Sequence, residues 1–397
     1  MIWIDMLLAG GASLYAAVLL WVTYHWHRMP RVAPLAASPP ARPFSIVVAA
    51  RNEAARISQL LDSLAGLHYA PSHWELIVVD DHSDDSTQAV VSAWAAAHPG
   101  VSLRLFSLRD PQSAGKKAAQ AYGVRQAHYD WIVVVDADCW APPNWLRCFD
   151  TFLQQHPQAV FVAGPVGLAP AHTAFTRWQA LEFAGLLVAG AVSFRRQGAY
   201  CSAANMAFSR SAYEAVWGRR SDLGQASGDD VFLLHALNAR YPGQTHFMKA
   251  PEATVWSLPQ EKFSGWWMQR LRWASKNLSV GQRNTSLGAT LVWLLMTGLL
   301  LRSLMAAAGA GSWLLALAWL LKVGGEATLL HAGSRWMAPP GAARIALAAQ
   351  AFQTAYIAAM GLLAPWAPFS WKKRRYGPAG RAPADLSSHT KNPLHRG

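Results

Sequence analysis

Cysteine and charged residues are both scarce in this chain of 397 residues. Its three cysteines, Cys139, Cys148 and Cys201, are an odd and scattered set. This excludes a disulfide framework and a zinc-type spacing, and a reduced compartment is the simplest expectation. Charged residues make up only 14% of the chain, whereas hydrophobic residues reach 52% and there are 20 tryptophans. The balance argues against a nucleic-acid-binding protein and predicts a protein partly solvated by lipid.

Acidic residues are also few relative to basic ones. Lys and Arg number 35 and Asp and Glu 22, so the formal net charge is +13. In a lipid-solvated protein this excess indicates a phosphate-bearing substrate or an anionic membrane surface as a partner.

Long apolar runs are absent between residues 44 and 259 but present on both sides of that region. Ile2–Trp26 is long enough to span a bilayer. Arg28 and Arg31 follow this run, whereas a secretory signal peptide carries its positive charge in front. A retained anchor is therefore favoured over a signal peptide, and the basic flank places the next domain in the cytoplasm of a bacterial-type cell.

The C-terminal part is apolar again after residue 286. Leu287–Leu321 predicts two spans joined by a tight turn, and Ala342–Trp366 is a third candidate. The basic segment Trp371–Gly377 should remain cytoplasmic, which conflicts with three crossings after a cytoplasmic domain. We therefore expect one candidate to be re-entrant or interfacial. Three charged residues make the first two candidates doubtful: Arg302, Lys322 and Glu326.

The central region alternates between strand and helix patterns. Strands are predicted at 44–50, 74–81, 101–108 and 131–138, and helices at 52–67, 86–98 and 115–127. Such alternation predicts an α/β fold of the Rossmann-like kind, with a mostly parallel sheet, helices on both faces and ligands at the carboxyl ends of the strands. The predicted divisions are an anchor (1–27), a linker (28–43), a catalytic domain (44–259), an interfacial helix region (260–286), transmembrane helices (287–366) and a basic, disordered cytoplasmic tail (367–397).

Two acids separated by one alanine, Asp136 and Asp138, follow the apolar strand at 131–138. Carboxylate oxygens suit Mg²⁺ or Mn²⁺, and one ion can be shared with a diphosphate. The turn-forming sequence that follows leaves an alternative, in which both aspartates serve the turn.

Acids also follow the strand at 74–81. Asp80 or Asp81 could accept hydrogen bonds from a ligand at the strand end, whereas Asp84 and Asp85 are interpreted as capping or surface acids. The loop could equally be a solvated helix cap throughout.

Two further motifs lie closer to the C-terminal apolar region. Asp229 and Asp230 begin an apolar helix, where acids are favoured by the helix dipole and where one could act as a general base. Gln269, Arg272 and Trp273 share one face of a predicted helix. Arginine could pair with phosphate and tryptophan could stack on a sugar, or the helix could lie in the membrane interface.

The order of these motifs is more specific than any one of them. VVAARNEA, VVDDHSDDST, GKKAA, DAD, GDD and QRLRW follow one another between Phe44 and Lys276. In this the chain resembles membrane-bound family 2 glycosyltransferases, an inverting group with the GT-A fold that includes cellulose synthase, hyaluronan synthase and ceramide glucosyltransferase. The flanking apolar segments are also similar to those of that family.

The resemblance implies a binding site for a nucleotide-sugar donor. Asp81, with Asp80 as the alternative, would receive the base of a uridine-type nucleotide. Arg51 and Glu53 would lie against the nucleotide, and Lys116 would face the diphosphate.

The resemblance also assigns the metal and the general base. Asp136 and Asp138 would be the ribose and metal pair for Mg²⁺ or Mn²⁺, with Asp138 the better metal ligand. Asp230 would be the general base, and Asp229 departs from the glutamate of the family, which leaves its supporting role in doubt. Gln269, Arg272 and Trp273 would close over the diphosphate and the acceptor.

These roles imply sugar transfer from a nucleotide-diphosphate sugar to a hydroxyl group. The few apolar runs favour a single transfer to a lipid or lipid-linked acceptor over a polymer channel, although a glycan acceptor and a processive synthase are the nearest alternative. A metal-dependent phosphohydrolase and a non-enzymatic nucleotide-sugar binder are further alternatives. The sequence indicates no nucleic acid and no protein partner.

Overall fold

A computed structural model describes residues 1–34, 40–109, 115–217, 229–277, 283–371 and 374–377, and for 229, 275–277, 283–286, 310, 370–371 and 374–376 the backbone alone. The chain divides into two compact units. The sheet unit comprises 30–169, 193–258 and 382–397, and the helical unit comprises 1–29, 170–192 and 259–381.

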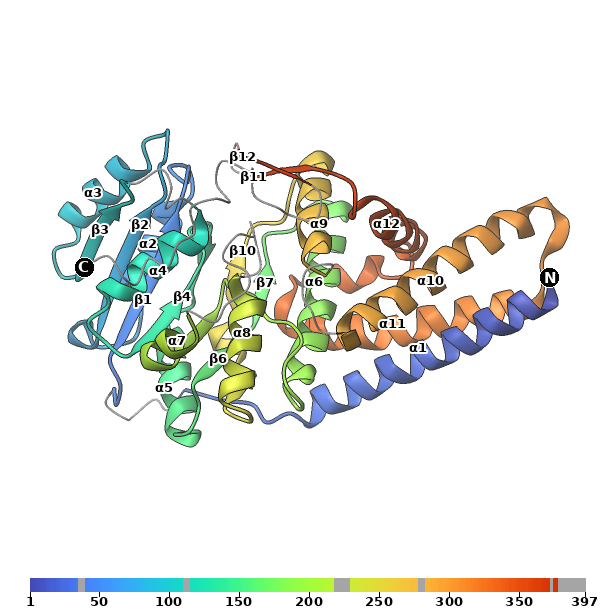
Figure 1. The fold of residues 1–397 in the computed structure, drawn as a ribbon, viewed down its shortest axis with the longest axis horizontal. Coiled ribbons are helices and arrows are strands. Elements are labelled where there is room, and N and C mark those ends of the chain that lie inside the picture. Colours follow the sequence, from blue (N-terminus) through green and yellow to red (C-terminus); the bar gives the residue numbers. More distant parts are fainter. Residues whose placement is uncertain (35–39, 110–114, 218–228, 278–282, 372–373, 378–397) are drawn as a thin grey trace. The chain divides into compact units, whose positions relative to one another are not determined.

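The sheet unit is built on a seven-stranded sheet with strand order β3-β2-β1-β4-β8-β6-β9 (Figure 1). Its strands are β1 (Phe44–Ala50), β2 (Trp74–Asp80), β3 (Leu103–Ser107), β4 (Trp131–Val134), β6 (Phe161–Ala163), β8 (Met206–Ser209) and β9 (Thr245–Phe247). The first four strands in this order are parallel, and β8 is antiparallel to both of its neighbours. The predicted mostly parallel α/β sheet is therefore confirmed.

Helices cover both faces of this sheet. They are α2 (Ile57–Ala65), α3 (Thr87–Ala97), α4 (Lys116–Gln126), α5 (Trp145–Gln155), α7 (Arg210–Trp217) and α8 (Asp229–Arg240), with short 3-10 turns at Pro71–His73 and Pro251–Ala253. Gly123 of α4 packs directly on Val79, whereas Gln88 of α3 donates to the neighbouring Asp80. Because consecutive strand residues point to opposite faces, α3 and α4 lie on opposite sides of β2.

A second, three-stranded sheet fixes the segment that follows β4. It pairs β5 (Cys139–Trp140) and β7 (Val166–Leu168) with the central β10 (Val255–Ser257). Trp256 therefore belongs to a strand.

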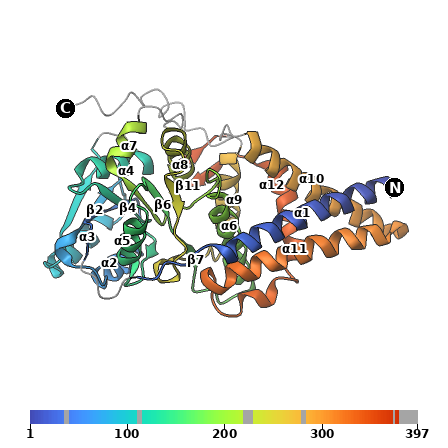
Figure 2. The same ribbon diagram turned by 90° about the horizontal axis from the view of Figure 1, so that it is seen from below.

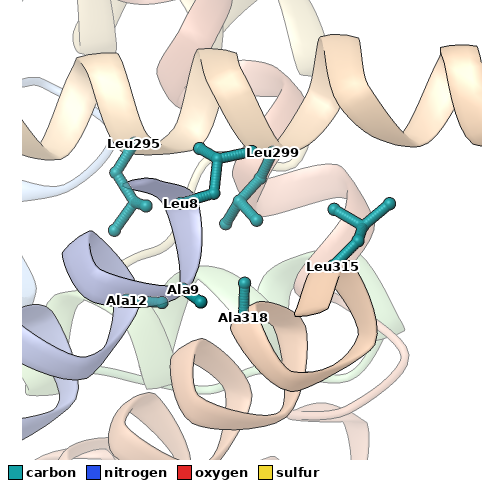
Figure 3. Close-up of a cluster of buried hydrophobic side chains, with 7 residues drawn as sticks. All are labelled: Leu8, Ala9, Ala12, Leu295, Leu299, Leu315 and Ala318. Carbon is teal, nitrogen blue, oxygen red and sulfur yellow. The ribbon is translucent and has the colours of Figure 1, made fainter. Parts of the chain in front are cut away.

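The helical unit contains six helices among its described residues: α1 (Ile2–Arg28), α6 (Ala174–Ser193), α9 (Phe263–Asn277), α10 (Arg283–Met305), α11 (Trp313–Met337) and α12 (Gln350–Leu363). Three helices are long and apolar enough to cross a membrane: α1, α10 from Leu287, and α11. They run side by side in both views (Figures 1 and 2). Figure 3 shows their shared core, which consists of Leu8, Ala9, Ala12, Leu295, Leu299, Leu315 and Ala318.

Small residues allow the closest approach between α1 and α11. A Cβ added at Gly325 would lie 2.9 Å from the Cα of Ala16, so only glycine permits this contact. Without a hydrophobic driving force between helices in lipid, such close packing is a main source of helix association.

The third C-terminal candidate, Ala342–Trp366, does not form a helix long enough to cross a membrane. This segment forms a 3-10 turn at Ala342–Ile345 and the 14-residue α12, which is too short to cross. The second span instead continues past Leu321 to Met337. The charges that made this region doubtful are buried and paired, as Asp5 with Arg302 and Lys322 with Glu326.

Two C-terminal spans remove the conflict over the basic tail. The turn between α10 and α11, where Gly309 has φ 94°, lies at the same end as the start of α1, because Asp5 bonds both Arg302 and Ser312. Crossings by α1, α10 and α11 would thus bring the end of α11 to the side of the membrane at which α1 ends.

The tail also differs from the expected disorder at its start. Phe369–Trp371 (β11) pairs with Arg374–Tyr376 (β12) in a short antiparallel hairpin. The remainder of the tail, 378–397, lies outside the described residues, as do 35–39 of the expected linker.

Candidate active site

The carboxyl ends of β1, β2 and β4 form one edge of the sheet, and the predicted acids follow these ends. Ala50 is aligned with Asp80, and Val47 with Val134. The loops that carry Asp81, Asp136 and Asp138 therefore leave the sheet at the same edge, as the sequence predicts.

Arg51 ties the first two of these loops together. Its Nη1 donates to the carbonyl oxygens of Asp81 (2.6 Å) and His82 (2.9 Å). Glu53 is buried, and its backbone N–H donates to Thr87 Oγ1 at 2.8 Å. In this structure both residues hold the loop that follows β1 against the loop that follows β2.

The backbone is strained at the second residue after each of two neighbouring strands, β1 and β2. Asn52 and His82, which are not glycines, have φ values of 53° and 55°. Such conformations cost on the order of 1 kcal/mol or more and occur often at binding sites. The Asn52 side chain compensates in part by accepting from the Asp84 N–H at 2.8 Å.

Asp80 and Asp81 are both buried but have different partners. Asp80 Oδ2 accepts from the Ser83 N–H and from Gln88, whereas its Oδ1 has no hydrogen bond within the described part of the chain. Asp81 Oδ1 accepts from the Gly115 N–H at 2.9 Å and contacts His82 Nδ1 at 3.2 Å. Asp81 thereby joins the β2 loop to the start of α4.

The two following acids behave as capping and surface groups. Asp85 accepts hydrogen bonds from the N–H groups of Thr87 and Ala54, and Asp84 bonds Asn52. Burial acts to raise the pKa of Asp85, but these hydrogen bonds outweigh it and hold the pKa below its usual value.

Each acid of the DAD motif lies near a cation. Lys116 Nζ is 2.5 Å from Asp136 Oδ1, and Arg56 Nη1 is 3.8 Å from Asp138 Oδ2. About a third of each aspartate side chain is exposed, 32% for Asp136 and 33% for Asp138. Sequence reasoning missed Arg56, because the only signal is its position just before α2.

The donor atoms at this motif fit a hard divalent cation bound together with a phosphate. Two partly exposed carboxylates are available, and no three His, Cys, Asp or Glu side chains among the described residues gather as a metal-binding group. Magnesium sites of this kind use one or two carboxylates and take their remaining ligands from substrate phosphates and water.

Asp230 reaches the same edge of the sheet by a different route. It is 5% exposed, and its two carboxylate oxygens accept from the N–H groups of Ala203 (3.2 Å) and Val231 (2.8 Å). Ala203 precedes β8, which runs antiparallel to β4 and so begins where β4 ends. On the other side, Lys117 of α4 lies 5.3 Å from the ring centroid of Phe232. The side chain of Asp229 lies outside what the structure describes.

Asn205 is a buried residue that the sequence did not identify. Its amide donates to the carbonyls of Pro165 and Ala253 at 2.8 Å, and its Oδ1 accepts from Trp145 Nε1 at 2.9 Å. A Cβ on Gly164 would lie 2.4 Å from this amide. The segment that leads into β8 is thus fixed by packing.

The nearby cysteine and histidine are poor candidates for chemistry. Burial raises the pKa of the Cys139 thiol, and the carboxylates of Asp138 and Asp136 raise it further. Burial lowers the pKa of His235 on α8. Both groups are therefore held in their neutral forms, which agrees with an incidental role for Cys139.

The structure brings eight of the predicted site residues to one edge of the sheet unit: Arg51, Glu53, Asp80, Asp81, Lys116, Asp136, Asp138 and Asp230. Gln269, Arg272 and Trp273 lie on α9 of the helical unit. There the Trp273 ring packs 5.7 Å from Phe183 and under the guanidinium of Arg270 at 4.4 Å.

Residues 39–276 match the family described as "Glycosyltransferase like family 2". Among relatives, the chain is 24% identical over 233 residues to a poly-beta-1,6-N-acetyl-D-glucosamine synthase of Staphylococcus epidermidis, which covers 58% of this chain and 53% of the synthase. It is 30% identical over 145 residues to a beta-monoglucosyldiacylglycerol synthase of Synechocystis, covering 36% of this chain and 30% of that protein. The chain spans about half the length of the relatives that it matches over more than 200 residues.

A solved structure extends the likeness to nearly the whole chain. The mannosyltransferase PcManGT from Pyrobaculum calidifontis, solved in complex with GDP-Man and Mn²⁺, has a TM-score of 0.60 and 22% identity, covering 91% of this chain and 98% of its own. The GT-A type of α/β domain with apolar helices at both ends is thereby confirmed. The match of the family to more than half of the sequence shows that this chain belongs to glycosyltransferase family 2.

Proposed function

We propose that this chain is an inverting glycosyltransferase that moves a sugar from a nucleotide-diphosphate sugar to a hydroxyl of a membrane lipid or lipid-linked acceptor at the cytoplasmic face. The observation that carries the proposal is the ion pair of Lys116 with Asp136, 2.5 Å apart, beside a second aspartate and at the same sheet edge as the buried Asp230. It supports the proposal because a lysine that could bind phosphate and a carboxylate that could act as a base belong to one compact unit.

The donor would bind along the loops that follow β1, β2 and β4. Asp81 or Asp80 would accept from the base, with Arg51 and Glu53 supporting the loops. The buried Oδ1 of Asp80, which has no hydrogen bond within the described residues, makes it an acceptor available to a ligand. Lys116 would turn from Asp136 toward the diphosphate when the donor binds.

Asp136 and Asp138 would hold a Mg²⁺ or Mn²⁺ ion. When bound, such an ion would neutralise negative charge that develops on the diphosphate leaving group. Lys116 would add to this stabilisation. The resemblance assigns the same role to Arg272, in a motif in which Gln269 and Trp273 would close over the diphosphate and the acceptor.

Asp230 would take the proton of the acceptor hydroxyl as its oxygen attacks the anomeric carbon. The carbon–oxygen bond to the diphosphate breaks in the same displacement, the nucleoside diphosphate leaves, and the anomeric configuration inverts. The backbone N–H groups of Ala203 and Val231 hold the carboxylate in one orientation. Asp229 would support it.

Two nucleosides are candidates for the donor, uridine and guanosine. The uridine assignment comes from the resemblance, whereas PcManGT was solved with GDP-Man. The donor is therefore best sought among uridine and guanosine diphosphate sugars together.

A lipid acceptor is favoured because the described residues contain only three helices that could span a membrane. One relative is a beta-monoglucosyldiacylglycerol synthase, whose name denotes a glycolipid product. The alternative is a processive polysaccharide synthase, which the likeness to a poly-beta-1,6-N-acetyl-D-glucosamine synthase favours.

The test incubates membranes that contain the protein with labelled UDP-glucose, UDP-N-acetylglucosamine or GDP-mannose, and Mn²⁺ or Mg²⁺. A lipid extract that gains one labelled sugar per acceptor supports the proposal, and a labelled polymer supports the alternative. Membranes with Asp230→Asn are the matched control. Label that appears equally with this variant, or only as free sugar, contradicts the proposed function.

A further inference from the structure

A buried ion pair lies inside the motif that carries Arg272. Arg270 of α9 is 5% exposed, and its Nη2 bonds Oε2 of Glu182, also 5% exposed, on α6. The hydroxyl of Tyr356 on α12 donates to the other carboxylate oxygen of Glu182. We call these three residues the α9 clamp.

Two tryptophan rings lie close to the guanidinium of Arg270. The Arg270 guanidinium lies 4.4 Å from the centroid of Trp273 and 5.7 Å from that of Trp266. Trp266 is fully buried, and its ring lies 5.3 Å from both Trp178 of α6 and Tyr356 of α12. Trp266 and Arg270, one helical turn apart, are both buried, so they define the face of α9 that is packed inside the helical unit.

This packing determines the rotation of α9 about its axis. With Arg270 directed to Glu182, Gln269 lies about 100° and Arg272 about 160° from it around the helix, both on the same side, because successive residues are about 100° apart. A charged pair buried this deeply is weak evidence for stability, because desolvation cancels most of the attraction. An apolar residue would fill the space as well, but it would not select one rotation of the helix.

We propose that the α9 clamp, Arg270 with Glu182 and Tyr356, is a positioning device that sets the rotation of α9 and with it the place at which Arg272 acts. The proposal rests on the proposed function, in which Arg272 stabilises the leaving diphosphate. Arg270, Glu182 and Tyr356 are positioning residues that act through Arg272.

Loss of the clamp affects the transition state more than donor binding. A displacement of about 1 Å at a group that stabilises charge can cost about 100-fold in rate. Glu182→Gln keeps the shape of the side chain and removes its charge. We expect kcat to fall 10- to 100-fold, with the donor KM within threefold of wild type. Tyr356→Phe removes one hydrogen bond and lowers kcat two- to fivefold.

Asp5→Asn is the matched control. Asp5 and Arg302 form a second buried carboxylate–arginine pair in the same unit, at the turn between α10 and α11 and on other helices than the clamp. This variant lowers the thermal stability of the detergent-solubilised protein and leaves kcat unchanged. An equal loss of kcat in Asp5→Asn and Glu182→Gln would show general destabilisation and overturn the proposal.

Hydrogen–deuterium exchange tests the clamp without any donor or acceptor. In Glu182→Gln and Tyr356→Phe, peptides from 263–277 exchange faster than in wild type, while those from α1 and from the sheet unit are unchanged. Unchanged exchange of 263–277 in both variants, or faster exchange throughout the helical unit, overturns the proposal. If wild-type protein transfers no sugar, the proposed function fails, and the exchange result still decides whether the clamp orients α9.

Discussion

The two acids of the DAD motif in the sheet unit and the paired acids of the helical unit differ in how far they are buried. In the sheet unit, Asp136 and Asp138 remain about one-third exposed, and each has a cation of a partly exposed side chain nearby. In the helical unit, three acidic residues are almost fully buried, and each pairs with a buried arginine or lysine. The pairs are Asp5 with Arg302, Glu182 with Arg270 and Glu326 with Lys322.

The difference shows that buried acids serve the packing of the fold, whereas partly exposed acids can bind a ligand. A charge removed from water must be neutralised within the fold, so the pairs of the helical unit are closed to outside ligands. The carboxylates at the sheet edge have exchangeable partners, because a partly exposed ion pair contributes little free energy. A metal ion or diphosphate can therefore replace those partners.

The largest expected effect comes from Asp230, the proposed general base. Asp230→Asn should lower transfer by a factor of about 10³, since general base catalysis contributes about 10²- to 10⁴-fold. Nucleotide binding, measured by calorimetry with UDP and GDP, should stay close to wild type. Asp84→Asn, which changes an exposed acid of the same unit, serves as the control, and normal turnover by Asp230→Asn would refute the assignment.

Removing one member of a buried ion pair in the helical unit should destabilise the fold strongly, whereas replacing both members with apolar residues should destabilise it little. Glu326→Leu leaves Lys322 buried without its carboxylate and should lower the free energy of unfolding by about 3–5 kcal/mol. The double variant Glu326→Leu with Lys322→Met should recover most of that loss, because both charges are gone. Thermal unfolding in detergent compares the two, and a double variant as unstable as the single one would contradict the comparison.

Breaking the partly exposed Lys116–Asp136 pair in the sheet unit should change ligand binding and leave the free energy of unfolding almost unchanged. Lys116→Ala should weaken nucleotide binding about tenfold, as expected for one lost charge-assisted hydrogen bond to phosphate. Binding of Mn²⁺ alone, followed by electron paramagnetic resonance, should be equal or tighter because Lys116 no longer competes for Asp136. Weaker Mn²⁺ binding with unchanged nucleotide binding would show that the lysine has a different role.

The smallest effects concern the acids that tie the loops. Asp85→Ala should cost about 1 kcal/mol, because two backbone N–H groups lose their acceptor, and Asp84→Ala less than that. The pKa of Asp85 is lowered in the folded protein, so its contribution is present at neutral pH and is lost as the pH falls below the ordinary value of 3.8. Wild type and Asp85→Ala should thus converge in urea unfolding at acid pH, and a gap that widened in acid would contradict this sign.

Much of the sheet unit could be predicted because its signals are local. Strand and helix periodicity identified β1 to β4 and the helices between them, and the parallel order then placed Asp81, Asp136 and Asp138 at one edge. Asp230 could be proposed only from its motif, since the antiparallel β8 that brings it there has no distinctive sequence.

The remaining features depend on partners that are distant in the sequence. Arg270 and Glu182 are separated by 88 positions, and Tyr356 lies a further 86 along the chain from Arg270 (174 − 88). No pattern of period or spacing links such residues. The same holds for Asn205, whose three hydrogen bonds come from separate segments. Hydrophobicity also overcounted the spans, because α12 is apolar enough to enter a membrane but too short to cross it.

The ion pair of Asp5 with Arg302 has a consequence for biosynthesis. The two residues are 297 positions apart, so at about 5–20 residues per second the ribosome adds the arginine roughly 15–60 s after the aspartate. During that interval the first helix would be in the translocon or the lipid with an unmatched carboxylate. Assembly of the three helices would therefore be completed only after the catalytic domain has been translated.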